Sequence, residues 1–296
     1  MYESYYQLNE RPFIHAPNTE CFYAGDYVRN SLSQLVRIVT RGEGVSLVVG
    51  PTGTGKSSVC QLLVEHFQFS HQVLYFQHGS FSSRHSFLES VVLALGIDNV
   101  RNSEAQNRTA IREHLFDLDE HPRSLLLIID DAHQMNSDVL EECRQLTNLV
   151  YSGATRVHLV LSGLLKLEDA MTHPSLASLN QRVVHRCYLS ALSGMESRCL
   201  IGDCLERAGG KLAELFTRDA LRKIYEYTEG VPRVIVQLVD RTMMLGMQRE
   251  QPMLDTYEVE LAWADLQQLP EPKSAEELEQ VPAPASSAIE FGLLSE

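Results

Sequence analysis

Gly50-Pro-Thr-Gly-Thr-Gly-Lys-Ser-Ser58 is the stretch of sequence that decides the fold. It fits the phosphate-binding pattern G-x-x-x-x-G-K-[ST], in which glycines let backbone N–H groups turn toward an anion. The lysine of such a loop brings a positive charge to the β- and γ-phosphates, and the serine hydroxyl after it can ligate Mg²⁺. The residues expected to hold phosphate are Gly50, Pro51, Thr52, Gly53, Thr54, Gly55, Lys56, Ser57 and Ser58, with Ser57 also a magnesium ligand.

The residues on either side of this loop support the same interpretation. Val45–Val49 is a short apolar run typical of a buried strand, and apolar residues recur at helical spacing from Val59 to Phe67. Strand, loop and helix are the setting that a phosphate-binding loop needs. A glycine-rich turn that matches by chance would not require these flanks, so the sequence predicts a nucleotide site.

Composition sets limits on the class of protein. The chain has 296 residues, 44% of them hydrophobic, which is enough for one large or two modest domains with a core. No apolar run approaches the roughly 18 residues of a membrane span, and the N-terminus lacks signal-peptide features, so we expect a cytoplasmic protein. The net charge of −14 disfavours nonspecific nucleic-acid binding, although it leaves room for a local basic patch. The six cysteines form no C-x-x-C pair and are expected to be reduced.

A second apolar run ends in two carboxylates. Leu125–Ile129 is typical of a strand buried on both faces of a parallel sheet, and Asp130 and Asp131 follow it directly. Beside a phosphate-binding loop, Asp130 is placed to hold Mg²⁺ or its water shell, and Asp131 to polarise an attacking water. Without that loop the pair would be an acidic turn after a core strand.

The remaining patterns predict the order of elements. Helices are expected over 26–41, 104–118 and 137–151, and strands over 73–76, 157–161 and 183–189, so strands and helices alternate as in a parallel α/β sheet. After Leu192 three or four helices follow, with no strand. We therefore predict an extended N-terminal segment (1–25), a nucleotide-binding domain (26–192), an α-helical domain (193–268) and an acidic, disordered tail (269–296).

Three arginines are further candidates for the site. Arg182 and Arg186 flank the last strand and are either surface charges or an arginine finger for a neighbouring subunit's γ-phosphate. Arg233 follows Gly230-Val-Pro in the first turn of a helix, where a cation opposes the helix dipole unless it meets an anion. A phosphate partner for Arg233 is therefore expected.

Together these features resemble an AAA+ ATPase. More narrowly, Tyr2-x-x-Tyr-Tyr-x-Leu-Asn-Glu-Arg-Pro-Phe13 resembles the start of the ExeA (GspA) secretion ATPases, to which the TniB/TnsC ATPases that regulate transposition are related. The resemblance covers about residues 1–268. It implies a parallel five-stranded sheet of order 5-1-4-3-2 with a C-terminal helical lid, and ATP bound between subunits of a homo-oligomer. It also implies Arg233 as the lid sensor and favours Arg182 over Arg186 as the finger.

The chain departs from this family at three places. The family usually has Glu where Asp131 stands, and it often has Gly-Gln where Gly163 is followed by Leu164. A polar sensor of the γ-phosphate is therefore either missing or moved to another residue, for which Ser162 is a candidate. ExeA proteins also continue into a transmembrane helix and a peptidoglycan-binding domain, whereas an acidic tail stands here. The cell-wall role is therefore not expected to carry over.

The expected function is that of an AAA+ ATPase that binds Mg·ATP and hydrolyses it slowly, to drive or gate assembly with a partner. One alternative is a nucleotide-gated regulator of DNA or a transposase with little turnover. Another is an accessory ATPase of secretion or polysaccharide export that acts through its tail. The tail ends in Ile289-Glu-Phe-Gly-Leu-Leu294, which would either dock a protein partner or fold back on the domain.

Overall fold

Short, mostly apolar strands build the central sheet of the protein. The computed structural model describes residues 2–14, 19, 22–98, 103–116, 124–151 and 154–270. The sheet order is β2-β3-β6-β1-β7, and every neighbouring pair is parallel. Counted along the chain as strands 1 to 5, this order is the predicted 5-1-4-3-2, which is confirmed. The strands are β1 (Val45–Val49), β2 (Gln72–Phe76), β3 (Leu125–Ile129), β6 (Val157–Gly163) and β7 (Val183–Tyr188).

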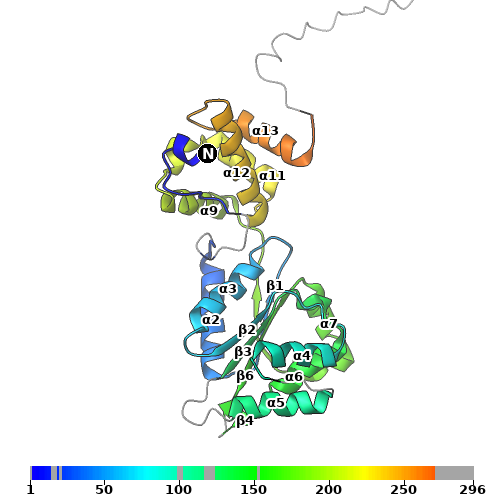
Figure 1. Ribbon diagram of the computed structural model, residues 1–296. Helices are drawn as coiled ribbons and strands as arrows, with labels where there is room; N and C mark the ends of the chain where they lie inside the picture. Colours follow the sequence, from blue (N-terminus) through cyan, green and yellow to red (C-terminus); the bar gives the residue numbers. More distant parts are fainter. Residues whose placement is uncertain are drawn as a thin grey trace, which may run out of the picture.

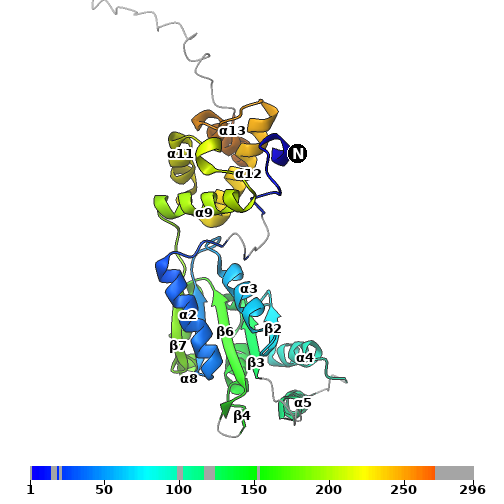
Figure 2. The same ribbon diagram turned by 90° about the vertical axis from the view of Figure 1, so that its left-hand side faces the viewer.

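Helices cover both faces of the sheet, as Figures 1 and 2 show. Along β3 the odd-numbered side chains from Leu125 to Ile129 join one core and the even-numbered ones join another, because successive residues of a strand point to opposite faces. The first core is closed by α4 (Arg84–Ala94), α5 (Glu104–Phe116) and α6 (Ser137–Leu146), and the second by α2 (Asp26–Arg41) and α3 (Lys56–Phe67).

Helix α6 is shorter than predicted. The expected helix over 137–151 ends at Leu146, where the Thr147 hydroxyl donates to the Arg144 carbonyl oxygen at 2.7 Å and competes with the helical pattern. The chain then forms a two-stranded antiparallel ribbon of β4 (Val150–Tyr151) and β5 (Ala154–Thr155). Short elements fill the other connections: η1 (Ala132–Gln134), α7 (Lys166–Met171), η2 (Pro174–Leu176) and α8 (Ala177–Asn180).

The helices after Leu192 form the predicted lid around a hydrophobic core of their own. Capping boxes at Ser193 and Asp255 begin two of these helices. A one-turn helix, α10, is added to the three or four that the sequence patterns indicate. The lid helices are α9 (Gly194–Arg207), α10 (Leu212–Leu215), α11 (Arg218–Thr228), α12 (Pro232–Gln248) and α13 (Thr256–Gln267).

The N-terminal segment packs on the lid, beside α12 (Figure 1). It starts with one helical turn, α1 (Tyr2–Tyr5), where an extended chain was predicted. Three aromatic side chains of this segment, Tyr2, Tyr6 and Phe13, lie in the core of the lid. The Tyr2 hydroxyl donates to the Asp240 carboxylate at 2.6 Å, and this contact ties the segment to α12. The predicted acidic tail lies outside the described residues beyond Pro270.

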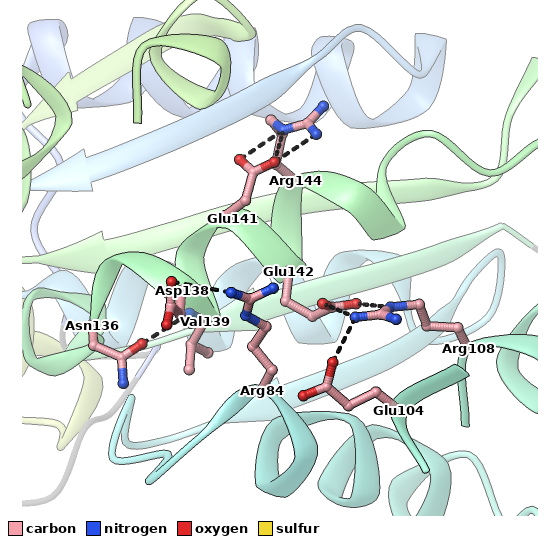
Figure 3. A network of polar contacts seen from close by, with 9 residues as sticks. All are labelled: Arg84, Glu104, Arg108, Asn136, Asp138, Val139, Glu141, Glu142 and Arg144. Atoms are coloured by element: carbon pink, nitrogen blue, oxygen red, sulfur yellow. Dashed lines mark hydrogen bonds and ion pairs between the residues drawn. The ribbon is translucent and has the colours of Figure 1, made fainter. Parts of the chain in front are cut away.

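A buried ion pair joins α5 to α6 (Figure 3). The Glu142 side chain is fully buried, and its two carboxylate oxygens each accept a hydrogen bond of 2.6 Å from the Arg108 guanidinium. Arg108 also contacts Glu104 at 3.0 Å, while Arg84 on α4 contacts Asp138 on α6 at 3.2 Å. These pairs hold together the three helices on one face of the sheet.

Replacing Arg108 with methionine should lower the free energy of unfolding by about 2–3 kcal/mol, measured by urea denaturation. Breaking a buried pair usually costs about 3–5 kcal/mol, and the exposed third of the Arg108 side chain (33%) lets water reduce this loss. The matched control is Arg84→Met, because its pair with Asp138 is exposed and should contribute below about 1 kcal/mol. The double variant Arg108→Met/Glu142→Met should be more stable than Arg108→Met alone, since no buried charge is left unpaired. Equal or lower stability of the double variant would contradict this interpretation.

Candidate nucleotide site

The phosphate-binding loop lies between β1 and α3, at the carboxyl edge of the sheet. Thr54 Oγ1 donates to the Pro51 carbonyl oxygen at 2.9 Å, which closes the turn. Gly53 has a φ of +81°, and a Cβ there would come within 2.9 Å of Val231 and 3.2 Å of Arg233. A larger residue at this position would therefore push the lid away from the loop.

Lys56 is the first residue of α3 and is buried in the loop. Its Nζ donates to the carbonyl oxygens of Gly50 at 3.0 Å and Pro51 at 2.8 Å. Burial lowers the pKa of this ammonium group, and the nearby Asp130 and Asp131 carboxylates oppose that shift. The side chain is thus folded back on its own loop, and an incoming phosphate would compete with these two carbonyl groups.

Asp130 lies behind the loop and links three elements. Its carboxylate accepts hydrogen bonds from Ser57 Oγ at 2.5 Å and from Ser162 Oγ at 2.7 Å. Ser162 is fully buried and is not among the residues that line the cavity described below, so its position does not favour it as a sensor of the γ-phosphate. Its hydroxyl fixes the carboxylate of Asp130 instead.

Asp131 stands at the edge of the cavity. Its backbone is left-handed, with a φ of 50°, and its side chain is 38% exposed. One carboxylate oxygen lies 3.8 Å from His78 Nδ1 and the other 3.8 Å from His133 Nδ1. The carboxylate therefore stands between two imidazoles at distances beyond a hydrogen bond.

The lid reaches the loop through the start of α12. The Arg233 backbone N–H donates to the Gly53 carbonyl oxygen at 3.1 Å, and the Arg233 side chain lines the cavity. Its positive charge lowers the pKa of Lys56 further, after the larger effect of burial. Two cations that face one cavity are suited to an anion with several charges.

A cavity of about 380 Å³ opens above the loop, within the usual size of a small-molecule site. The loop, the lid and the N-terminal segment all contribute to its wall. The sequence patterns did not assign Ile14, Phe22, Tyr23, His133 or Gln134 to the site. The abundance of Tyr and Phe in residues 1–25 is the one signal for the aromatic members, and it gives no indication of which of them face the cavity.

Ser57 and Asp130 provide suitable donors for magnesium. Mg²⁺ prefers oxygen ligands and is commonly held by one or two protein groups together with substrate phosphates and water. The Ser57 hydroxyl and the Asp130 carboxylate supply hard oxygens 2.5 Å apart at the end of the loop. Within the described ranges no cluster of three His, Cys, Asp or Glu side chains could hold a metal by itself. The residues therefore fit an ion that is completed by a nucleotide.

Arg182 and Arg186 lie away from this cavity. The Val45 N–H donates to the Arg182 carbonyl oxygen at 2.9 Å, so Arg182 is at the amino end of β1, roughly 16 Å along the strand from the loop. Its guanidinium donates to Thr147 and Asn148. Arg186 contacts Glu168 at 3.1 Å. The structure thus brings together the loop, both aspartates and Arg233, but neither of these two arginines.

The chain is similar to proteins with AAA domains. Residues 39–171 match the family described as "AAA domain". General secretion pathway protein A of Aeromonas hydrophila is 28% identical over 251 residues, or 84% of this chain, and the chain spans 45% of the length of that relative. The resemblance to AAA+ ATPases of this secretion type, expected from the motifs, is confirmed.

Solved structures of low identity share the fold. Cdc6p of Pyrobaculum aerophilum matches with a TM-score of 0.66 at 18% identity, covering 88% of this chain and 73% of that one. The Aeropyrum pernix ORC1 protein, solved with DNA, gives 0.64 at 13% identity over 87% and 71%. The RuvB branch migration motor of Thermotoga maritima gives 0.53 at 19% over 83% and 70%. Among the described residues, no helix has the length and apolar character that crossing a membrane requires.

Proposed function

We propose that this protein, whose AAA domain resembles that of a secretion-pathway ATPase, binds Mg·ATP and hydrolyses it slowly to control assembly with a partner. One observation carries the proposal. The Ser57 hydroxyl and the Asp130 carboxylate lie 2.5 Å apart at the end of a phosphate-binding loop, with Lys56 and Arg233 facing the same cavity. This arrangement pairs two hard oxygen donors with two cations, which suits a metal-bound polyphosphate.

The residues of the loop would bind and orient the triphosphate. Lys56 would leave the Gly50 and Pro51 carbonyl oxygens and stabilise charge on the β- and γ-phosphates. Ser57 and Asp130 would hold Mg²⁺, which when bound neutralises charge on the phosphate oxygens. Asp131 would orient the attacking water for in-line displacement. Pre-positioned charges of this kind supply most of the catalysis in phosphoryl transfer.

Arg233 would couple the nucleotide to the lid. Its backbone already contacts Gly53, and Arg233 lines the same cavity as Lys56. A γ-phosphate between these two cations would draw the start of α12 toward the loop. We therefore assign Arg233 the role of lid sensor, within an organisation of segment 1–25, nucleotide-binding domain 26–192, lid 193–268 and tail from 269.

The position of Arg182 favours assembly through a second copy of the chain. Within one chain it lies at the far end of the sheet from the cavity, so it would reach a γ-phosphate only on a neighbour. Thr147 and Asn148 hold its guanidinium near the surface. This supports Arg182 as the arginine finger of a homo-oligomer that forms on ATP binding.

If Arg182 acts in trans, the rate of phosphate release per subunit should rise with protein concentration at saturating Mg·ATP. Arg182→Ala should lower the plateau rate on the order of a thousandfold, the usual contribution of an arginine finger, while ATP affinity in dilute protein stays within a few fold. Arg186→Ala is the matched control, since it removes a guanidinium four residues further along the chain, within β7. A wild-type rate that stays flat across the dilution series would count against assembly. A loss confined to Arg186→Ala would move the finger to that residue.

The name of the secretion-pathway relative favours a protein partner over DNA, as does the net charge of −14. One structural neighbour was solved in complex with DNA and another is a Holliday junction branch migration motor, so DNA is the second candidate. Stimulation of phosphate release by duplex DNA at physiological salt would support the alternative function, a nucleotide-gated regulator that acts on DNA. An unchanged rate with DNA would leave a protein partner, recruited through the tail, as the proposal.

A further inference from the structure

The carboxyl end of β6 offers no polar side chain to the cavity. Ser162 is buried and donates to Asp130, Gly163 has no side chain, and Leu164 lines the cavity with an apolar one. A γ-phosphate held by Lys56 and Ser57 would therefore meet no hydrogen-bond donor from this strand. Such donors raise the affinity of a site for polyphosphates and its selectivity among them. Another element of the cavity wall would have to supply the donor here.

The His133 imidazole lies against this end of the strand. His133 belongs to η1, which follows Asp131, and it lines the cavity with its side chain 15% exposed. A Cβ on Gly163 would stand 3.2 Å from the His133 backbone nitrogen and 3.3 Å from Nδ1. The missing side chain of Gly163 is thus what allows the ring to approach β6.

Hydrogen bonding decides which ring nitrogen can donate. The Leu164 backbone N–H donates to His133 Nδ1 at 3.4 Å, so Nδ1 is an acceptor and the neutral ring carries its hydrogen on Nε2. The Asp131 carboxylate lies 3.8 Å from His133 Nδ1, which is too far for a hydrogen bond between them. Asp131 therefore does not replace the Leu164 N–H as the partner of Nδ1. The Nε2–H group is therefore left as a donor on a residue that lines the cavity.

We propose that His133 recognises the terminal phosphate of a nucleoside triphosphate by donating from Nε2, in place of a polar side chain at Leu164. The inference rests on the proposed function and makes it more specific, because the donor distinguishes ATP from ADP. ADP lacks the phosphate that His133 would contact. A charged acceptor makes the hydrogen bond worth roughly ten- to a hundredfold in affinity.

The test compares the affinities of a non-hydrolysable ATP analogue and ADP, both with magnesium, by calorimetry on the full chain. His133→Ala should reduce the ATP-over-ADP preference roughly ten- to a hundredfold and leave ADP affinity within about twofold. Two further variants separate the ring nitrogens. The amide nitrogen of His133→Gln occupies about the position of Nε2 and should retain most of the preference. The amide nitrogen of His133→Asn occupies about that of Nδ1 and should behave like alanine.

His78→Ala is the matched control. The His78 imidazole is also 3.8 Å from Asp131, but it is 74% exposed and does not line the cavity, so the preference should not change. If His133→Ala and His133→Asn keep the wild-type preference for ATP over ADP, this inference is overturned, but the proposed function is not. Equal losses for ATP and ADP, or a glutamine variant as weak as asparagine, would also overturn it. A wild-type protein that binds neither nucleotide would instead overturn the proposed function, and this inference with it.

Discussion

Replacing Lys56 with alanine is expected to weaken Mg·ATP binding by roughly a hundredfold or more. Lys56 is buried at the start of α3, and its ammonium group is the cation that the phosphate-binding loop itself contributes. Removing one partner of a buried charge pair costs about 2–5 kcal/mol, and each 1.4 kcal/mol is a factor of ten. Titration with a fluorescent ATP analogue measures the loss directly.

The control for this variant must separate binding from folding. Lys56 Nζ donates to the Gly50 and Pro51 carbonyl oxygens, so alanine also removes two contacts within the loop. Lys211→Ala, which removes an exposed lysine on the lid, should change neither affinity nor melting temperature. If Lys56→Ala melts near the wild-type temperature and still binds the analogue with unchanged affinity, the loop does not hold the phosphates.

The sequence predicted the strands of the sheet because most of them are short apolar runs; β7, which contains His185 and Arg186, is the exception. β1 and β3 were predicted to the residue, since both faces of each strand are buried and every residue of the two strands except Ser46 is apolar. The order of the strands could not come from these patterns and was implied by the family resemblance. The end of α6 was missed because Thr147 and the β4–β5 ribbon depend on contacts beyond the helix.

The parts of the site that are local in sequence were predictable, and the parts that depend on packing were not. Gly50–Ser58 and Asp130 follow directly from one loop and one strand end. The contact of Ser162 with Asp130, and the approach of His133 to Gly163, arise only when β3 and β6 lie side by side. The remote position of Arg182 is likewise a property of the sheet, since it depends on which end of β7 meets β1.

Asp131 stands where the chain departs from the family that it resembles, and its backbone geometry bears on that difference. Its φ of 50° lies in the left-handed region, which aspartate and asparagine adopt more readily than other side chains. Glutamate at this position would carry its carboxylate one methylene, about 1.5 Å, further toward the cavity. Asp131 therefore suits the backbone but has a shorter reach, which is the physical basis for expecting slow hydrolysis with ordinary ATP affinity.

Asp131→Asn should slow phosphate release at saturating Mg·ATP by about a hundredfold or more, because it removes the carboxylate that would orient the water. Asparagine fits the same left-handed backbone and volume, so ATP affinity and melting temperature should stay near those of the wild type. Asp131→Glu should raise the rate, because a misplacement of about 1 Å can cost a hundredfold, and it should lower stability by about 1 kcal/mol through backbone strain. Single-turnover phosphate release measures the rates, and thermal melting measures the strain. A wild type that hydrolyses ATP rapidly without a partner, together with an Asp131→Asn variant of unchanged rate, would show that another group orients the water.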